Sequence, residues 1–135
     1  MKIVVGGLGR KSGKTSMVCR IIRLFPERPW LAVKVTAHVH CSALAPYTFT
    51  EETQAGGSGD TCRYLAAGAR RAVLLEGDLD AAMPSLLTLL ASTPDWIVES
   101  NRAASRLAAD FTFFVADPES AADDEKLRRF FTGLE

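Results

Sequence analysis

The amino-terminal segment of the chain constrains its fold most strongly. A short β-branched run, Lys2-Ile3-Val4-Val5-Gly6, leads into the glycine-rich stretch Gly7-Leu8-Gly9-Arg10-Lys11-Ser12-Gly13-Lys14-Thr15-Ser16, and an apolar helical pattern follows. A strand that turns through glycines into a helix offers backbone N–H groups at the positive end of that helix, where a phosphate binds well. We therefore expect a phosphate-binding loop over residues 9–16. In such a loop Lys14 would reach the β- and γ-phosphates, and the Thr15 hydroxyl would coordinate Mg²⁺.

One position departs from the full phosphate-loop signature. The signature has glycine five residues before Gly13, and this chain has Leu8 there, flanked by Gly7 and Gly9. The flanking glycines keep the backbone freedom that the turn needs. The alternative interpretation is a glycine-rich strand-to-helix turn that binds nothing.

Apolar segments of strand length alternate with segments of helical spacing along the chain. The expected strands cover residues 2–6, 30–37, 71–76, 96–99 and 111–115. The expected helical segments cover residues 15–25, 61–69, a helix with Pro84 in its first turn, a helical turn at 102–109, and 123–131. Apolar strands of this kind need helices on both faces, so we expect a three-layer α/β fold of the P-loop NTPase type, with a mostly parallel sheet of about five strands.

The segment 38–59 shows no clear period and contains Pro46, Gly56, Gly57 and Gly59. We expect an irregular loop of about twenty residues there, and loops of that length in a compact domain are usually functional or mobile. Ligands of parallel sheets bind at the carboxyl ends of the strands. The candidate positions therefore follow the strands, at 7–15, 38–59, 77–78, 99–101 and Asp117.

Carboxylates at strand ends could complete a metal site beside the phosphate loop. Glu99 ends the apolar strand Trp96-Ile97-Val98 and is expected to bind Mg²⁺ through water or to orient an attacking water, although it could simply face solvent. Glu76 also ends a strand, and for it a structural role is preferred. Asp60 ends the long loop and is either a third acid that closes on the nucleotide or a plain N-cap of the next helix.

The two histidines, His38 and His40, stand beside Cys41. They could contribute to a partial metal site with Cys62, but the spacing matches no well-defined zinc pattern. Hydrogen bonds from the imidazoles to a substrate phosphate or a carboxylate are an alternative, as is a solvated pair without a role.

Composition narrows the class of protein. The 135 residues suffice for a single domain, residues 1–135, and 16 basic residues balance 16 acidic ones, so no electrostatic footprint for nucleic acid is expected. No apolar run has the length of a membrane span, and the amino terminus lacks the pattern of a signal peptide. Three cysteines at no framework spacing predict reduced thiols in a cytoplasmic protein.

Several motifs occur in the order of one family. After the phosphate loop come Ala32-Val33-Lys34-Val35, His38-Val39-His40, Asp60-Thr61-Cys62-Arg63 with Ala67-Gly68-Ala69, and Val98-Glu99-Ser100-Asn101. In this order the chain resembles the molybdopterin-guanine dinucleotide biosynthesis protein B (MobB) family of P-loop proteins, over most of residues 1–117. His38 and His40 fall near the histidine motif of that family but have a different spacing.

The resemblance implies binding of GTP or ATP with Mg²⁺, weak hydrolysis, a homodimer, and an accessory role with an enzyme that attaches guanylate to the molybdopterin cofactor. It implies nucleotide contacts by Gly13, Lys14 and Thr15, and metal or water-positioning roles for Asp60 and Glu99. Two other functions stay open. One is a small-metabolite kinase with residues 38–59 as its lid, although no arginine lies between Pro29 and Asp60. The other is a non-catalytic scaffold whose interaction surface depends on bound nucleotide.

Overall fold

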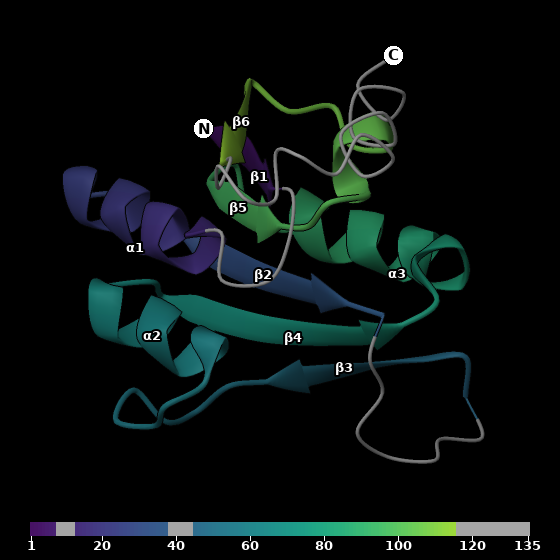
Figure 1. The fold of residues 1–135 in the computed structure, drawn as a ribbon, viewed down its shortest axis with the longest axis horizontal. Helices are drawn as coiled ribbons and strands as arrows, with labels where there is room; N and C mark the ends of the chain where they lie inside the picture. The colour runs from purple at the N-terminus through teal and green to yellow at the C-terminus, as the bar shows by residue number, and fades with distance from the viewer. Residues whose placement is uncertain (8–12, 38–44, 116–135) are drawn as a thin grey trace.

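The computed structural model describes residues 1–7, 13–37 and 45–115, which form one six-stranded sheet, three α-helices and a short 3₁₀ helix (Figure 1). The strands are β1 (Lys2–Gly7), β2 (Leu31–Thr36), β3 (Tyr47–Glu51), β4 (Arg71–Gly77), β5 (Trp96–Glu99) and β6 (Phe111–Val115). The helices are α1 (Lys14–Leu24), α2 (Asp60–Ala67), α3 (Leu79–Ala91) and the 3₁₀ helix η1 (Ala103–Ser105). All five strands expected from the sequence are present, within one or two residues of their expected bounds.

The strands lie in the order β3-β4-β2-β5-β1-β6, and every pairing is parallel except that of β3 with β4. The α/β class and the mostly parallel sheet are therefore confirmed. The order places β5 between β1 and β2, so the carboxyl ends of these three strands meet at one edge of the sheet (Figure 1).

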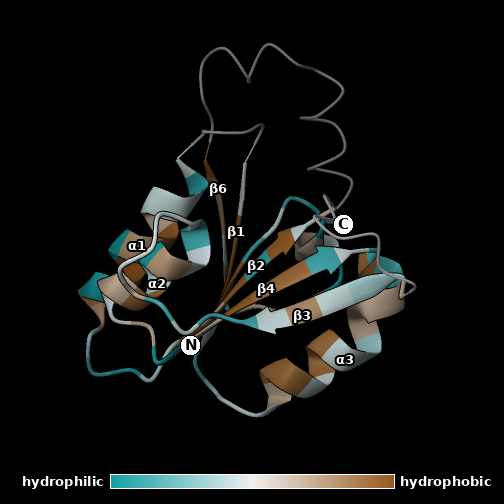
Figure 2. Ribbon diagram, turned by 90° about the horizontal axis from the view of Figure 1, so that it is seen from below, coloured by the Kyte–Doolittle hydropathy of each residue, from teal (hydrophilic) through white to brown (hydrophobic). Residues whose placement is uncertain are grey.

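The sheet is covered on both faces, which gives three layers (Figure 2). On one face, α1 and α2 pack over a core that includes Ile22, Trp30 and Tyr64. On the other face, α3 and η1 pack over a core that includes Leu86 and Trp96. Because β1, β2 and β5 are buried on both faces, their sequences are almost wholly apolar.

The prediction of an irregular loop over residues 38–59 was wrong for residues 47–51, whereas residues 52–59 have no regular secondary structure. Residues 47–51 form β3, an antiparallel edge strand, so the sheet has six strands rather than five. The side chains of Tyr47 and Phe49 alternate with threonines, and both rings pack against the α3 core, 5.7 Å apart between centroids. A short strand with weak alternation of apolar and polar residues can form at the edge of a sheet, because it pairs with one neighbouring strand and buries only one face.

Positions 77–78, which were candidate functional positions after a strand, form the turn that joins β4 to α3. Gly77 adopts φ +115° and lies so close to the chain before β3 that an added Cβ would come within 2.4 Å of the Pro46 carbonyl oxygen. The Asp78 carboxylate then accepts hydrogen bonds from the backbone N–H groups of Asp80 (2.9 Å) and Ala81 (3.4 Å), which caps α3. In the structure, Gly77 thus allows the close approach of two backbone segments, and Asp78 caps α3.

The helices differ from their predicted bounds in three places. Pro84 was expected in the first turn of its helix, but α3 begins at Leu79 and Pro84 is its sixth residue, because the Asp78 cap starts the helix earlier. Asp60 is the first residue of α2 and does not cap it, since Gly59 occupies the N-cap position. The helical turn expected at 102–109 is reduced to the three residues of η1.

Some expectations fall outside the described residues. These are the ones for Leu8, for His38, His40 and Cys41, for Asp117, and for the helix at 123–131. Among the helices of the described residues, none combines the length and the apolar character that crossing a membrane requires.

Candidate functional site

The structure describes the start of α1 from Gly13 onward. Gly13 adopts φ +94°, a left-handed conformation that glycine takes without strain, and its carbonyl oxygen accepts the N–H of Met17 at 2.9 Å. Lys14 is the first residue of α1 and Thr15 is buried beside it. Within the described part of the chain, no side chain caps this helix start, and the first turn of α1 holds no acidic residue of its own.

Glu99 lies at the centre of the site. Its side chain is 2% exposed, and its Oε1 accepts hydrogen bonds from the Thr15 hydroxyl at 2.7 Å and the Tyr64 hydroxyl at 2.5 Å. Its Oε2 pairs with the ammonium group of Lys34. Glu99 thus lies beside the start of α1, and the alternative of a solvent-facing glutamate is wrong.

Lys34 connects Glu99 to Asp60. Its Nζ lies 3.0 Å from Asp60 Oδ2, so one ammonium group contacts both carboxylates that were expected to act near the metal. Burial would lower the pKa of Lys34, but the charge and hydrogen bond of Glu99, together with Asp60, outweigh it and raise that pKa. Lys34 is therefore a firmly charged cation in this cluster.

The arrangement follows from strand register. Lys34 on β2 and Glu99 on β5 are Cα partners across two parallel strands, so their side chains emerge on the same face of the sheet. That face is the one covered by α1 and α2, which bring Thr15, Tyr64 and Asp60 to the carboxylate.

Burial also shapes the chemistry of Tyr64. Its side chain is fully buried, and this burial, followed by the nearby charge of Glu99, raises the pKa of the phenol well above its usual value. The hydroxyl therefore stays protonated and donates a hydrogen bond to Glu99 Oε1.

Asn101 and Arg63 make further polar contacts at the start of α1. Asn101 Oδ1 accepts hydrogen bonds from the Gly7 N–H at 2.9 Å and from Lys14 Nζ at 3.2 Å. Arg63 on α2 donates to the Ser16 hydroxyl at 3.1 Å and lies 4.0 Å from Asp60 Oδ1. The Asn101 contacts join the end of β1 to the first residue of α1, and the Arg63 contacts join the first turn of α1 to Asp60.

Sequence reasoning and structure agree in part on the site residues. The structure brings together Lys14, Thr15, Ser16, Asp60 and Glu99, and it places Gly13 at the start of α1. The expected phosphate contacts at Gly9, Arg10, Lys11 and Ser12 lie outside the described residues. Glu76 lies on β4, which β2 separates from the strand of Glu99.

No role was expected from the sequence for Lys34, Tyr64 or Arg63. A signal existed for Lys34, because a lysine within the apolar strand Leu31-Ala32-Val33-Lys34-Val35 needs a carboxylate partner once buried. No local pattern identifies Tyr64 or Arg63, whose roles depend on how α2 docks against α1.

Hydrogen bonds join Glu52, the residue after β3, to the first turn of α2. The Glu52 carboxylate accepts hydrogen bonds from the Thr61 hydroxyl at 2.8 Å and the Cys62 thiol at 2.9 Å. These bonds lower the pKa of Glu52, the thiol contributing most. Cys62 is thereby engaged with Glu52, and in the described part of the chain no three His, Cys, Asp or Glu residues lie close enough to hold a metal.

The donor atoms of the cluster fit Mg²⁺. The Thr15 hydroxyl and the carboxylates of Glu99 and Asp60 are hard oxygen ligands, and Mg²⁺ is usually bound by few protein oxygens together with phosphate and water. A site with so few protein ligands suits an ion that arrives with a nucleotide. The Lys34 ammonium lies between the two carboxylates.

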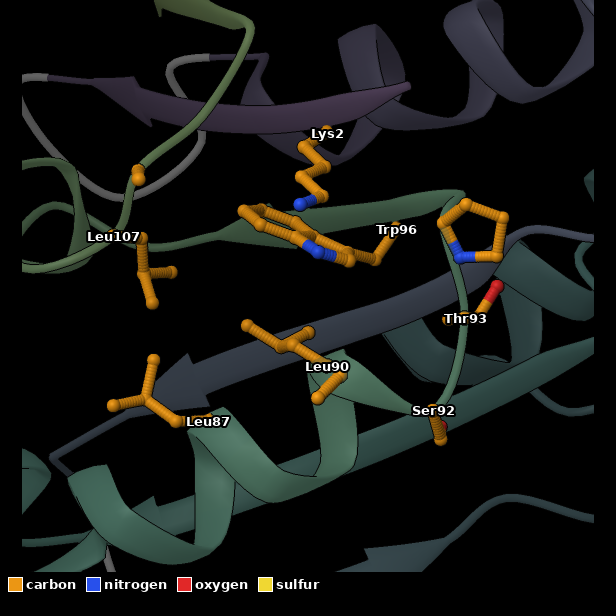
Figure 3. A pocket seen from close by; sticks show the side chains of 10 residues that line it. Lys2, Leu87, Leu90, Ser92, Thr93, Trp96 and Leu107 are labelled. Atoms are coloured by element: carbon orange, nitrogen blue, oxygen red, sulfur yellow. The ribbon is translucent and has the colours of Figure 1, made fainter.

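A separate groove of about 590 Å³ opens at the other end of the sheet (Figure 3). It is lined by Lys2 and Trp96 at the starts of β1 and β5, by Leu87 and Leu90 of α3, and by Leu107. Because ligands of parallel sheets bind at the carboxyl ends of the strands, this groove is not the expected nucleotide site.

Comparisons with protein-family models, with curated proteins and with solved structures found no match to this chain.

Proposed function

We propose that the chain binds a nucleoside triphosphate, GTP or ATP, together with Mg²⁺ at residues 9–16 and the carboxyl ends of β1, β2 and β5. The observation that carries the proposal is the 2.7 Å hydrogen bond between the Thr15 hydroxyl and Glu99, at the start of a helix whose first residue is Lys14. A phosphate-loop threonine and a strand-end acid hold the same Mg²⁺ in the phosphate-loop arrangement, so they have to be neighbours.

Each residue has a distinct part in this proposal. Gly13 and the α1 amino end supply backbone N–H groups to the phosphates, and Lys14 exchanges its contact with Asn101 for the β- and γ-phosphates. The Thr15 hydroxyl would be an oxygen ligand of Mg²⁺, and the Glu99 and Asp60 carboxylates would help to hold the ion, directly or through water. The Mg²⁺ ion, when bound, neutralises charge on the phosphate oxygens.

The proposed activity is weak hydrolysis at most. Both oxygens of Glu99 already accept hydrogen bonds from protein groups, which suits a carboxylate that orders ligands better than one that removes a proton from water. The same observation supports a second candidate, a non-catalytic scaffold whose interaction surface depends on bound nucleotide.

The order of the sequence motifs supports a MobB-like setting for this nucleotide binding. In that setting the protein is a cytoplasmic homodimer that assists an enzyme in attaching guanylate to the molybdopterin cofactor. The contacts of Lys34 with Asp60 and Glu99 connect three of those motifs, because the three residues come from separate segments and both acids contact one ammonium group.

Calorimetric titration of GTP and ATP, with and without Mg²⁺, tests the proposal. Wild type should bind with micromolar affinity, and Lys14→Ala should weaken binding by about 100-fold, because a phosphate-bound ammonium is a charge-assisted contact worth about 3 kcal/mol. Lys2→Ala is the matched control, since Lys2 lies at the opposite end of β1 and lines the groove of Figure 3. No binding by wild type, or a loss with Lys2→Ala alone, would refute the proposal.

A further inference from the structure

The cation between Glu99 and Asp60 is part of the chain itself. Lys34 Nζ contacts Glu99 Oε2 and lies 3.0 Å from Asp60 Oδ2, and its side chain is 21% exposed. Glu99 is 2% exposed, so its charge depends on this partner far more than an exposed carboxylate would.

The other contacts of the two acids leave Lys34 as the central cation. Thr15 and Tyr64 both donate to Glu99 Oε1 but are neutral hydroxyl groups. Arg63 approaches only the opposite oxygen of Asp60, at 4.0 Å, and its side chain is 46% exposed. Among the described residues, Lys34 is therefore the cation shared by both carboxylates.

An ammonium in this position competes directly with a divalent cation. A metal that binds Glu99 Oε2 or Asp60 Oδ2 meets the positive charge of Lys34 at contact distance, where repulsion is strong because the pair is partly buried. A lysine side chain has a flexible four-carbon stem, so the ammonium can also move away when a stronger cation arrives.

We propose that Lys34 is an internal counter-ion that keeps the nucleotide-free protein from binding divalent metal, so that Mg²⁺ enters only with the nucleotide. The inference rests on the proposed function in that it takes Glu99 and Asp60 as the metal-side acids. Lys34 acts here as a positioning residue, and its effect is on metal affinity rather than on a reacting atom.

Metal binding by the full chain without nucleotide tests this directly, with Mn²⁺ as the probe and the electron paramagnetic resonance signal of free Mn²⁺ as the readout. Wild type should bind Mn²⁺ only weakly, in the millimolar range. Lys34→Met, which keeps the apolar stem and removes the charge, should bind at least about tenfold more tightly. Lys34→Arg should stay as weak as wild type, and Lys34→Met combined with Glu99→Gln should lose the gain.

A melting experiment covers the case in which Lys34→Met folds poorly because Glu99 loses its partner. About 10 mM Mn²⁺ should then restore folding and raise the melting temperature of Lys34→Met, while leaving wild type unchanged, since a ligand stabilises the state that binds it. Equal Mn²⁺ affinity of Lys34→Met and wild type would overturn the inference, as would a Lys34→Met chain that stays unfolded at that concentration.

The outcome is separable from that of the proposed function. Nucleotide binding by wild type with no gain in Mn²⁺ affinity for Lys34→Met would refute the counter-ion role alone. Tighter Mn²⁺ binding by Lys34→Met, with no nucleotide binding by wild type, would refute the nucleotide proposal and leave the competition between Lys34 and metal in place.

Discussion

Removing the hydroxyl of Tyr64 should destabilise the protein through a single lost hydrogen bond. Tyr64 is fully buried and its hydroxyl donates to Glu99 Oε1 at 2.5 Å. Phenylalanine fills nearly the same space, so the ring packing is kept. Glu99 also keeps Thr15 and Lys34, so the carboxylate is not left without partners.

The magnitude follows from the charge of the acceptor. A hydrogen bond to a charged group contributes about 1.5–3 kcal/mol, so Tyr64→Phe should lower the free energy of unfolding by that amount. For a domain of this size the melting temperature should fall by roughly 5–12 °C.

The chain offers a matched control, because Tyr47 is the other of its two tyrosines. Its hydroxyl lies 3.0 Å from the Ser85 hydroxyl at the surface, where water replaces a lost partner. Tyr47→Phe should therefore change stability by about 0.5 kcal/mol or less.

Urea denaturation and thermal melting, followed by far-UV circular dichroism, measure both tyrosine variants. Alkaline titration of the phenolate absorbance adds an independent readout. The phenol that titrates late in wild type should be absent from Tyr64→Phe, since burial raises the pKa of Tyr64 well above its usual value. A Tyr64→Phe protein as stable as wild type would show that the hydroxyl is not bonded to Glu99 and would refute the buried cluster.

Two other predictions concern acids. Glu99→Gln should leave nucleotide affinity near that of wild type but lower both hydrolysis and its dependence on Mg²⁺; calorimetry and phosphate release measure this, and wild-type hydrolysis would return Glu99 to a structural role. Glu52→Gln should flatten the acid limb of the stability curve. The folded-state pKa of Glu52 is lowered, chiefly by the Cys62 thiol, so its contribution is present above the unfolded pKa of about 4.3 and is lost as the pH falls through the folded value. Urea midpoints measured from pH 7 downward should converge for Glu52→Gln and wild type, and a constant gap would contradict this linkage.

The sequence was sufficient for the central strands because they are buried on both faces. The apolar runs that became β1, β2, β4 and β5 differ sharply from the polar segments around them, and short strands of that kind imply covering helices. Glu99 could be placed for the same reason, since an acid that directly follows such a run lies at the ligand-binding edge of a parallel sheet.

The remaining features depend on contacts between distant segments. β3 exists because Tyr47 and Phe49 reach the α3 core and because β4 offers a free edge, and neither fact is local to residues 47–51. From the sequence, Asp60 was either an acid near the nucleotide or a helix cap; in the structure it is the first residue of α2 and contacts Lys34 of β2. Tyr64 is one of several apolar-side residues of α2, and only the docking of that helix assigns its hydroxyl to Glu99.

The most direct test of the central claim is a crystal structure of the full chain with Mg²⁺ and a non-hydrolysable GTP analogue. The account predicts the triphosphate over Gly13 and the first turn of α1, with Mg²⁺ on the Thr15 hydroxyl and the Lys34 ammonium withdrawn from Glu99. A nucleotide seated instead in the groove lined by Trp96 and Leu107, with the Thr15 and Glu99 hydrogen bond unchanged, would contradict it.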